Sequence, residues 1–271
     1  MTSLRDQFED PAEAVVEGLY ELGFDDTDIL GGVPDLEPDP ADFDSPVEYL
    51  RDHEHTVYGP FDESSEERKW ERATGLFDVA IPSGFALDWK WHAHKVASQA
   101  SRGLELFGHE MTTRIPTSDR NYLEPKSKHP PVFYVELYEK DDEKIRDEVV
   151  IRLPPSKSER SAILNHEAVA EALNRTLLDD LGLELVWRCA LPGDRAPFAI
   201  LEKDRLNELQ STYGEGVSLF GKEVFERGLL ERALEGYAPE NAVDHEAEFG
   251  VPEPAETFKV EELPEASKIV E

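Results

Sequence analysis

Cysteine and long apolar runs are nearly absent from this chain. The single cysteine, Cys189, excludes an internal disulfide and a cysteine-rich zinc site, and its neighbours Trp187 and Leu191 indicate a small buried side chain. No apolar run approaches the ~18 residues that a membrane-spanning helix needs. Residues 1–10 lack the basic and apolar stretches of a signal peptide. We therefore expect no membrane contact, and a location in the cytoplasm or within a virus particle.

Basic residues are also scarce. The chain has 28 Lys and Arg against 60 Asp and Glu, which gives a formal net charge of −32. Such a surplus strains a compact state by self-repulsion, and concentrated salt relieves it because the Debye length falls to about 3 Å at 1 M. The composition resembles that of proteins from salt-in halophiles, above all haloarchaea and their viruses. It indicates an environment and leaves the activity open.

The charge is divided unevenly along the sequence. Residues 1–67 hold 21 acidic and two basic residues, and residues 231–271 hold 12 acidic and three basic ones. Residues 89–129, called the basic island below, hold four acidic residues and seven basic ones. These seven are Lys90, Lys95, Arg102, Arg114, Arg120, Lys126 and Lys128.

Periodicity and turn residues predict an α+β fold with two small sheet-plus-helix units between acidic, Pro-rich arms. We expect an N-terminal arm over 1–61, a first unit over 62–153, a second over 154–238 and a tail over 239–271. Residues 25–46 and the tail are acidic and carry several prolines, which predicts extended segments.

Apolar spacing, caps and glycines predict the individual elements. The expected helices span 11–22, 46–50, 62–72, 96–107, 158–181, 204–213 and 222–234. The expected strands span 76–81, 85–91, 132–138, 148–153, 183–191, 198–201 and 217–220. Residues 112–131 are expected to form a loop. Leu173, Leu177, Val186 and Trp187 are expected in the core.

One candidate active site lies on the expected hairpin 76–91. Asp78 and the sequence Asp88-Trp89-Lys90 follow one helix and precede another, and this order resembles the core of PD-(D/E)xK nucleases. The resemblance covers about 45 of the 271 residues. It implies that Asp78 and Asp88 would bind a divalent metal and that Lys90 would help to activate water. Phe77 stands where that family has proline, so ordinary surface charges on a hairpin are the simpler interpretation.

Two His-x-His pairs form a second candidate. His53 and His55, and likewise His92 and His94, would share a face if each pair lay on a strand. Four imidazoles suit zinc, nickel or copper, as in a metal-binding sensor. The simpler alternative is that these are ordinary surface histidines.

The basic island is the third candidate. It could bind nucleic acid through cations and aromatic rings, it could bind the acidic arm of another chain, or it could be a plain solvated surface. We favour the acidic arm, with apolar anchors at Phe249, Val251 and Phe258, because apolar contacts survive high salt better than charge pairs.

These observations favour a structural subunit of an oligomeric assembly in a halophile, such as a head or neck connector of a haloarchaeal virion. Its expected partners are copies of itself or other subunits, and no cofactor is expected. A metal-dependent nuclease or nucleic-acid-binding protein is the alternative, and a metal sensor ranks third.

Overall fold

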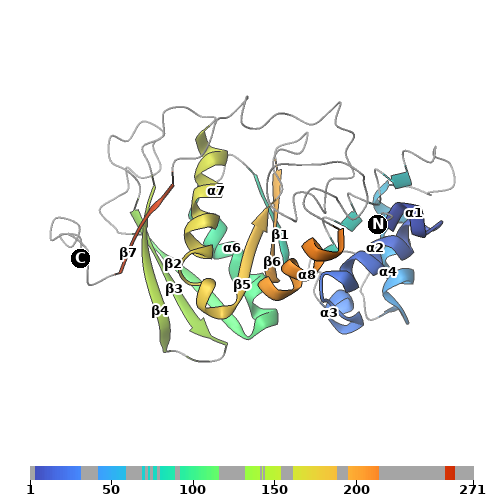
Figure 1. The fold of residues 1–271 in the computed structure, drawn as a ribbon, viewed down its shortest axis with the longest axis horizontal. Helices are drawn as coiled ribbons and strands as arrows, with labels where there is room; N and C mark the ends of the chain where they lie inside the picture. Colours follow the sequence, from blue (N-terminus) through green and yellow to red (C-terminus); the bar gives the residue numbers. More distant parts are fainter. Residues whose placement is uncertain are drawn as a thin grey trace. The chain divides into compact units, whose positions relative to one another are not determined.

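The computed structural model describes residues 4–31, 42–58, 69–70, 73, 76–77, 80–88, 92–115, 132–140, 142, 144–153, 161–187, 195–213 and 254–259. Helices and two antiparallel sheets make up this part of the chain, so the fold is α+β, as the sequence predicted (Figure 1). None of its helices has the length and apolar character needed to cross a membrane. The chain divides into two compact units.

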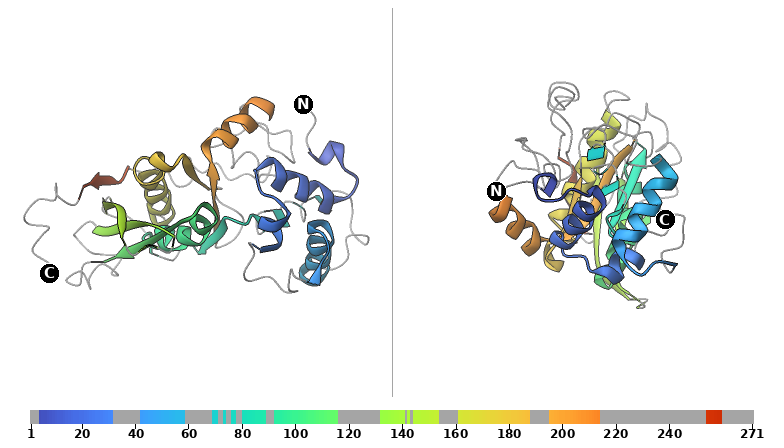
Figure 2. Two further views of the ribbon diagram at one scale, coloured as in Figure 1. Left: turned by 90° about the horizontal axis from the view of Figure 1, so that it is seen from below. Right: turned by 90° about the vertical axis from the view of Figure 1, so that its right-hand side faces the viewer.

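The first unit is helical. It contains α1 (Leu4–Gln7), α2 (Pro11–Glu21), α3 (Asp26–Gly31), α4 (Pro46–Tyr58) and α8 (Lys203–Tyr213). Helix α2 contacts both α1 and α4, and Figure 2 shows α2 and α4 side by side. Its buried face includes Val15 and Leu19, which are fully buried. Burial of this apolar face stabilises the unit.

Local sequence signals set both ends of α2. Asp10 accepts a hydrogen bond from the Ala12 amide (2.9 Å), and Pro11 occupies the first helical position, where its missing N–H costs nothing. Gly23 ends the helix with a φ of 100°, a left-handed conformation that favours glycine. Gly18 lies against Phe77, since a Cβ at this position would stand 2.8 Å from the Phe77 ring.

Helix α8 joins this unit through Arg205. Its guanidinium donates hydrogen bonds to the carbonyl oxygens of Tyr20 and Glu21 at the end of α2. A cation at a helix C-terminus interacts favourably with the helix dipole and with carbonyls that lack an intrahelical partner.

The second unit contains the four-stranded sheet, helices α6 and α7, and most of the three-stranded sheet; residues 84, 186–187 and 201–202 of the latter belong to the first unit. Its elements are β1 (Gly84–Asp88), α6 (Lys95–Leu104), η3 (Glu105–Phe107), β2 (His109–Arg114), β3 (Val132–Glu139), β4 (Ile145–Arg152), α7 (Ser161–Asn174), η5 (Asp179–Leu181), β5 (Leu183–Trp187), β6 (Arg195–Glu202) and β7 (Glu256–Phe258). One sheet has the strand order β1-β6-β5, and the other has the order β2-β3-β4-β7. Figure 1 shows the latter, with β7 alongside β4.

Alternation along β3 separates the two faces of the four-stranded sheet. Phe133, Val135 and Leu137 are buried, whereas the residues between them are partly exposed. Helix α6 contacts β2 and α7, and the Ser101 hydroxyl accepts a hydrogen bond from the Met111 amide (2.9 Å). The buried face of the sheet therefore forms a core with these helices.

A side-chain amide connects α7 to the smaller sheet. Asn174 donates to the Leu185 carbonyl and accepts from the Leu185 amide, both at 2.7 Å. On this sheet, the Phe85 and Phe198 rings stack with centroids 5.2 Å apart. Together these contacts connect α7, β5, β1 and β6 within one unit.

Several predicted elements are confirmed. The capped helix at Asp10, the helical segment that ends at Gly108, the β3–β4 hairpin and the helix at 204–213 are all present. Leu173, Leu177 and Val186 are buried as expected. The side chain of Trp187, and the elements predicted at 217–220 and 222–234, lie outside the described residues.

Other predictions are wrong. Leu76, Phe77 and Ala80 are helical instead of extended, because apolar residues at 76, 77 and 80 have helical spacing and all three are fully buried. Residues 26–31 form α3. Asp25 and Asp28 cap its start, because the side chain of each accepts a hydrogen bond from the backbone amide of the other (3.0 Å). Residues 109–114 form β2, although a loop was expected from residue 112 onward. The helix at 46–50 continues to Tyr58, and the helix at 158–181 is α7 followed by η5.

The expected division of the chain into four segments stays a prediction. Strand β4 and helix α7, expected on opposite sides of a boundary at residue 153, both belong to the second unit, and α8 belongs with the N-terminal helices. Residues 256–258, expected in an extended tail, form β7.

Candidate assembly interface

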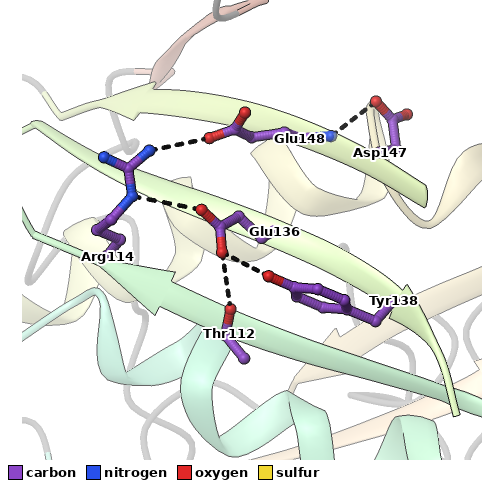
Figure 3. A network of polar contacts seen from close by, with 6 residues as sticks. All are labelled: Thr112, Arg114, Glu136, Tyr138, Asp147 and Glu148. Atoms are coloured by element: carbon purple, nitrogen blue, oxygen red, sulfur yellow. Dashed lines mark hydrogen bonds and ion pairs between the residues drawn. The ribbon is translucent and has the colours of Figure 1, made fainter. Parts of the chain in front are cut away.

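The partly exposed face of the four-stranded sheet carries a polar network (Figure 3). Glu136 on β3 lies directly opposite Thr112 on β2 and Glu148 on β4. It accepts hydrogen bonds from the Tyr138 hydroxyl (2.7 Å), the Thr112 hydroxyl (3.3 Å) and the Arg114 guanidinium (3.3 Å). All of its partners come from neighbouring positions on one face, which is the consequence of the strand register.

Arg114 bridges two carboxylates that would otherwise repel each other. Its guanidinium lies 3.3 Å from both Glu136 and Glu148, and like charges directly opposite on adjacent strands destabilise a sheet. The same guanidinium lies 4.2 Å from the centre of the Tyr134 ring, at cation–π distance. Arg114 therefore stabilises three strands at once.

This network shifts the pKa of two groups. Burial alone would raise the pKa of Glu136, but hydrogen bonds from Tyr138, Arg114 and Thr112 and the charge of Arg114 outweigh it, so this pKa lies below the ordinary value. The hydrogen bond to Glu136, followed by burial, raises the pKa of Tyr138. At neutral pH Glu136 is therefore an ionised carboxylate and Tyr138 a neutral phenol.

The second feature of this face is the docking site of β7. Val150, Ile151 and Arg152 on β4 lie opposite Phe258, Thr257 and Glu256, in an antiparallel pair. The Arg152 guanidinium lies 4.8 Å from the centre of the Phe258 ring and 3.1 Å from the Glu256 carboxylate. One arginine thus contacts both side chains that β7 presents on this face.

Contacts just before β7 extend the docking site. The Ala255 side chain is buried, and its carbonyl oxygen accepts a hydrogen bond from Arg175, which directly follows α7 (3.3 Å). Val150 is fully buried in the row between Tyr134 and Phe258. We call the residues that hold β7 the arm clamp; they are Val150, Ile151, Arg152 and Arg175.

The predicted tail anchors are only partly described. Phe258 packs against β4 of its own chain in this structure, where it contacts the arm clamp. Binding of this anchor to the basic island of another chain stays a prediction. Phe249 and Val251 lie outside the described residues. The arm clamp itself was missed, because Arg152 and Arg175 carry no motif and become neighbours of the tail only through the fold.

The basic island is divided by the structure. Lys95 and Arg102 are exposed on α6, whereas Arg114 is committed to Glu136 and Glu148. The remaining four, Lys90, Arg120, Lys126 and Lys128, lie outside the described residues. Binding of nucleic acid or of an acidic arm by this segment stays a prediction.

The His-x-His pairs are not equivalent. His53 and His55 lie on α4, where positions two apart do not share a face, so the expected strand geometry is wrong for this pair. The rings of His92 and His94 stack in parallel with centroids 5.8 Å apart. Among the described residues, no three His, Cys, Asp or Glu side chains gather where they could share a metal ion.

His94 is part of the core instead. It is buried, and its ring meets the edge of Phe133 at 6.3 Å. Burial lowers the pKa of His94 to about 4, with smaller contributions from His92, Lys95 and His166. The imidazole is therefore neutral at neutral pH, and protonation would place a charge in the core.

The side chains of the nuclease-like residues lie outside the described part of the chain. Asp88 ends β1, but its side chain, together with Asp78 and Lys90, lies outside the described part of the chain. The described residues around Asp78 are helical, so the first strand of that hairpin is absent there. The metal-ligand roles of Asp78 and Asp88 stay a prediction.

A polar hollow lies on the first unit along α8. Arg205 in its wall is engaged with the carbonyls of α2 and with Glu208, so its cation is already satisfied. The lining residues are Glu202, Asp204, Arg205, Asn207, Glu208, Ser211 and Thr212.

Comparison with known proteins finds no match to this chain. No protein family model matches the chain, no curated protein matches its sequence, and no solved structure matches its fold. We therefore infer function from the geometry of the four-stranded sheet.

Proposed function

We propose that this chain is a structural subunit that assembles through its C-terminal arm, residues 239–271. The observation that carries the proposal is the docking of β7 on the arm clamp. Addition of a strand to a sheet edge is a recurrent mode of protein association, in which the main chain gives affinity and side-chain contacts give specificity. The arm uses both components.

The chemistry of the contact suits concentrated salt. Salt screens the Arg152–Glu256 ion pair. The salt concentration affects the other contacts much less, namely the backbone pairing, the packing of Arg152 on Phe258 and the burial of Ala255. An acidic chain with a net charge of −32 needs such contacts, because its copies repel one another at low salt. Assembly of a haloarchaeal virion is one setting that fits these properties.

A matched pair of variants tests the proposal. Phe258→Ala removes the ring beneath Arg152, and it should weaken assembly while the body stays folded, with the apparent dissociation constant rising roughly tenfold, as for loss of about 1.4 kcal/mol. Thr257→Ser is the control, because this side chain points to the other face of β7. Light scattering in high salt measures the mass of both, and circular dichroism confirms the fold. Equal masses for the wild type and Phe258→Ala would contradict the proposal.

A further inference from the structure

We propose that the partner is a second copy of the same chain, and that β7 is exchanged between copies: in the assembled state, β7 of one chain occupies the arm clamp of its neighbour. This inference rests on the proposed function and specifies the partner. It concerns the same arm clamp and requires no new surface, because each copy supplies one strand and one clamp.

The contacts that hold β7 are confined to a short stretch of sequence. In the described part of the chain, residues 254–259 are separated from the preceding helix, α8, by residues 214–253. Forty residues can span up to about 130 Å when fully extended. The length of the chain therefore permits β7 to reach the clamp of a neighbour.

Charge and shape identify β7 itself as the occupant of the neighbour's clamp. Arg152 contacts an acidic and an aromatic side chain two positions apart on one face, Glu256 and Phe258. Arg175 binds the carbonyl of Ala255 directly before them. A clamp that recognises this spacing in its own chain recognises the identical strand of a second copy equally well.

The closed and exchanged forms make the same contacts and differ only in the tether. Within one chain the tether supplies an effective concentration in the millimolar range, so the closed form dominates in dilute solution. Subunits held side by side in an assembly reach a similar local concentration, and exchange then links them. Assembly should therefore depend steeply on protein concentration.

Disulfide trapping between different chains tests the exchange. Arg152 and Glu256 are directly opposite in the register, so Arg152→Cys in one full-length chain and Glu256→Cys in another can form a disulfide only after exchange. Both chains carry Cys189→Ser, which removes the single native thiol. The two are mixed in high salt and oxidised at protein concentrations from about 10 μM to about 1 mM, a range that rises to the effective concentration within one chain. We expect the yield of mixed disulfide dimer to rise at least tenfold over that range.

Two controls fix the interpretation. A chain carrying both cysteines should close an internal disulfide when dilute, and Arg152→Cys mixed with Thr257→Cys should give no dimer, because position 257 faces the other way. If the double variant closes but the mixture gives no dimer at about 1 mM, β7 stays in its own chain and the exchange is refuted. If the double variant does not close, the pair Val150→Cys and Phe258→Cys repeats the test one step along the same face, and failure of that pair also refutes the register on which exchange depends.

The result separates this inference from the proposed function. Assembly that is lost with the arm but yields no mixed dimer means that the arm binds another surface, and exchange is then wrong while the proposed function stands. Assembly that is unchanged without the arm contradicts the proposed function itself.

Discussion

Replacing Arg114 with methionine removes the cation that bridges Glu136 and Glu148. Three contributions to stability are then lost. The cation–π contact with Tyr134 is worth about 0.5–1 kcal/mol at an exposed site, and each of the two ion pairs about 0.2–1 kcal/mol. Repulsion between the two facing carboxylates adds about 0.2–1 kcal/mol.

The exposure of Arg114 reduces this sum. Its side chain is 58% exposed, and salt screens its charge, so we expect the free energy of unfolding to fall by about 1–2 kcal/mol. Urea unfolding at pH 7 in a fixed concentration of KCl measures this value, because urea leaves the ionic strength unchanged. Arg146→Met is the matched control, since Arg146 makes an exposed ion pair with Glu139, and it should cost less than about 0.5 kcal/mol.

The energetic coupling between Arg114 and Glu148 is a more specific test than the loss of stability alone. Glu148→Gln should destabilise the wild type but partly restore the Arg114→Met variant, because the repulsion between the carboxylates disappears. Loss of Arg114 should also raise the pKa of Glu136 toward its ordinary value of 4.5. In the wild type, the stability that Glu136 contributes is present above its unfolded-state pKa and is lost as pH falls through the lower folded-state pKa. The Arg114→Met variant should therefore lose less stability than the wild type over this pH range. If Arg114→Met costs no more than Arg146→Met and shows no coupling to Glu148, the reasoning is refuted.

Three further predictions concern the fold. Acidification from pH 6.5 to about 4 should destabilise the protein by up to about 3 kcal/mol, because His94 binds a proton only in the unfolded state over that range. The His94→Asn variant should flatten this part of a plot of unfolding free energy against pH. Unfolding midpoints should rise from low to multimolar KCl as salt screens the net charge of −32, and a flat profile would refute the prediction of a halophilic origin. Leu177→Ala should lower the free energy of unfolding by about 2–5 kcal/mol in urea, because this buried side chain leaves a cavity, and a cost below 1 kcal/mol would contradict its core position.

Local signals in the sequence were sufficient for much of the secondary structure. Asp10, Gly23 and Gly108 mark helix ends that depend on nearby backbone geometry alone, so they could be predicted without the fold. The β3–β4 hairpin follows from alternation and a charged turn. The segment at 76–81 was misassigned because a short apolar run suits a buried helix or a strand equally well.

The pairing of strands far apart in the chain could not be predicted from the sequence. Strand β7 is three residues long and lies about a hundred positions from β4, so neither its alternation nor its partner could be detected locally. The polar network could not be predicted for the same reason, because Arg114, Glu136 and Glu148 come together only through the register of three strands. Phe258 was chosen for its apolar character in an acidic tail, but its contact with Arg152 required the structure.

The mass of the full-length protein and of a chain ending at residue 238, both in high salt, tests the central claim most directly. The shortened chain lacks β7 but retains every strand and helix described before it. We expect the full-length protein to form a defined oligomer whose mass depends on concentration, and the shortened chain to be folded and monomeric. Two chains with the same oligomeric state at every concentration would contradict the claim that the C-terminal arm mediates assembly.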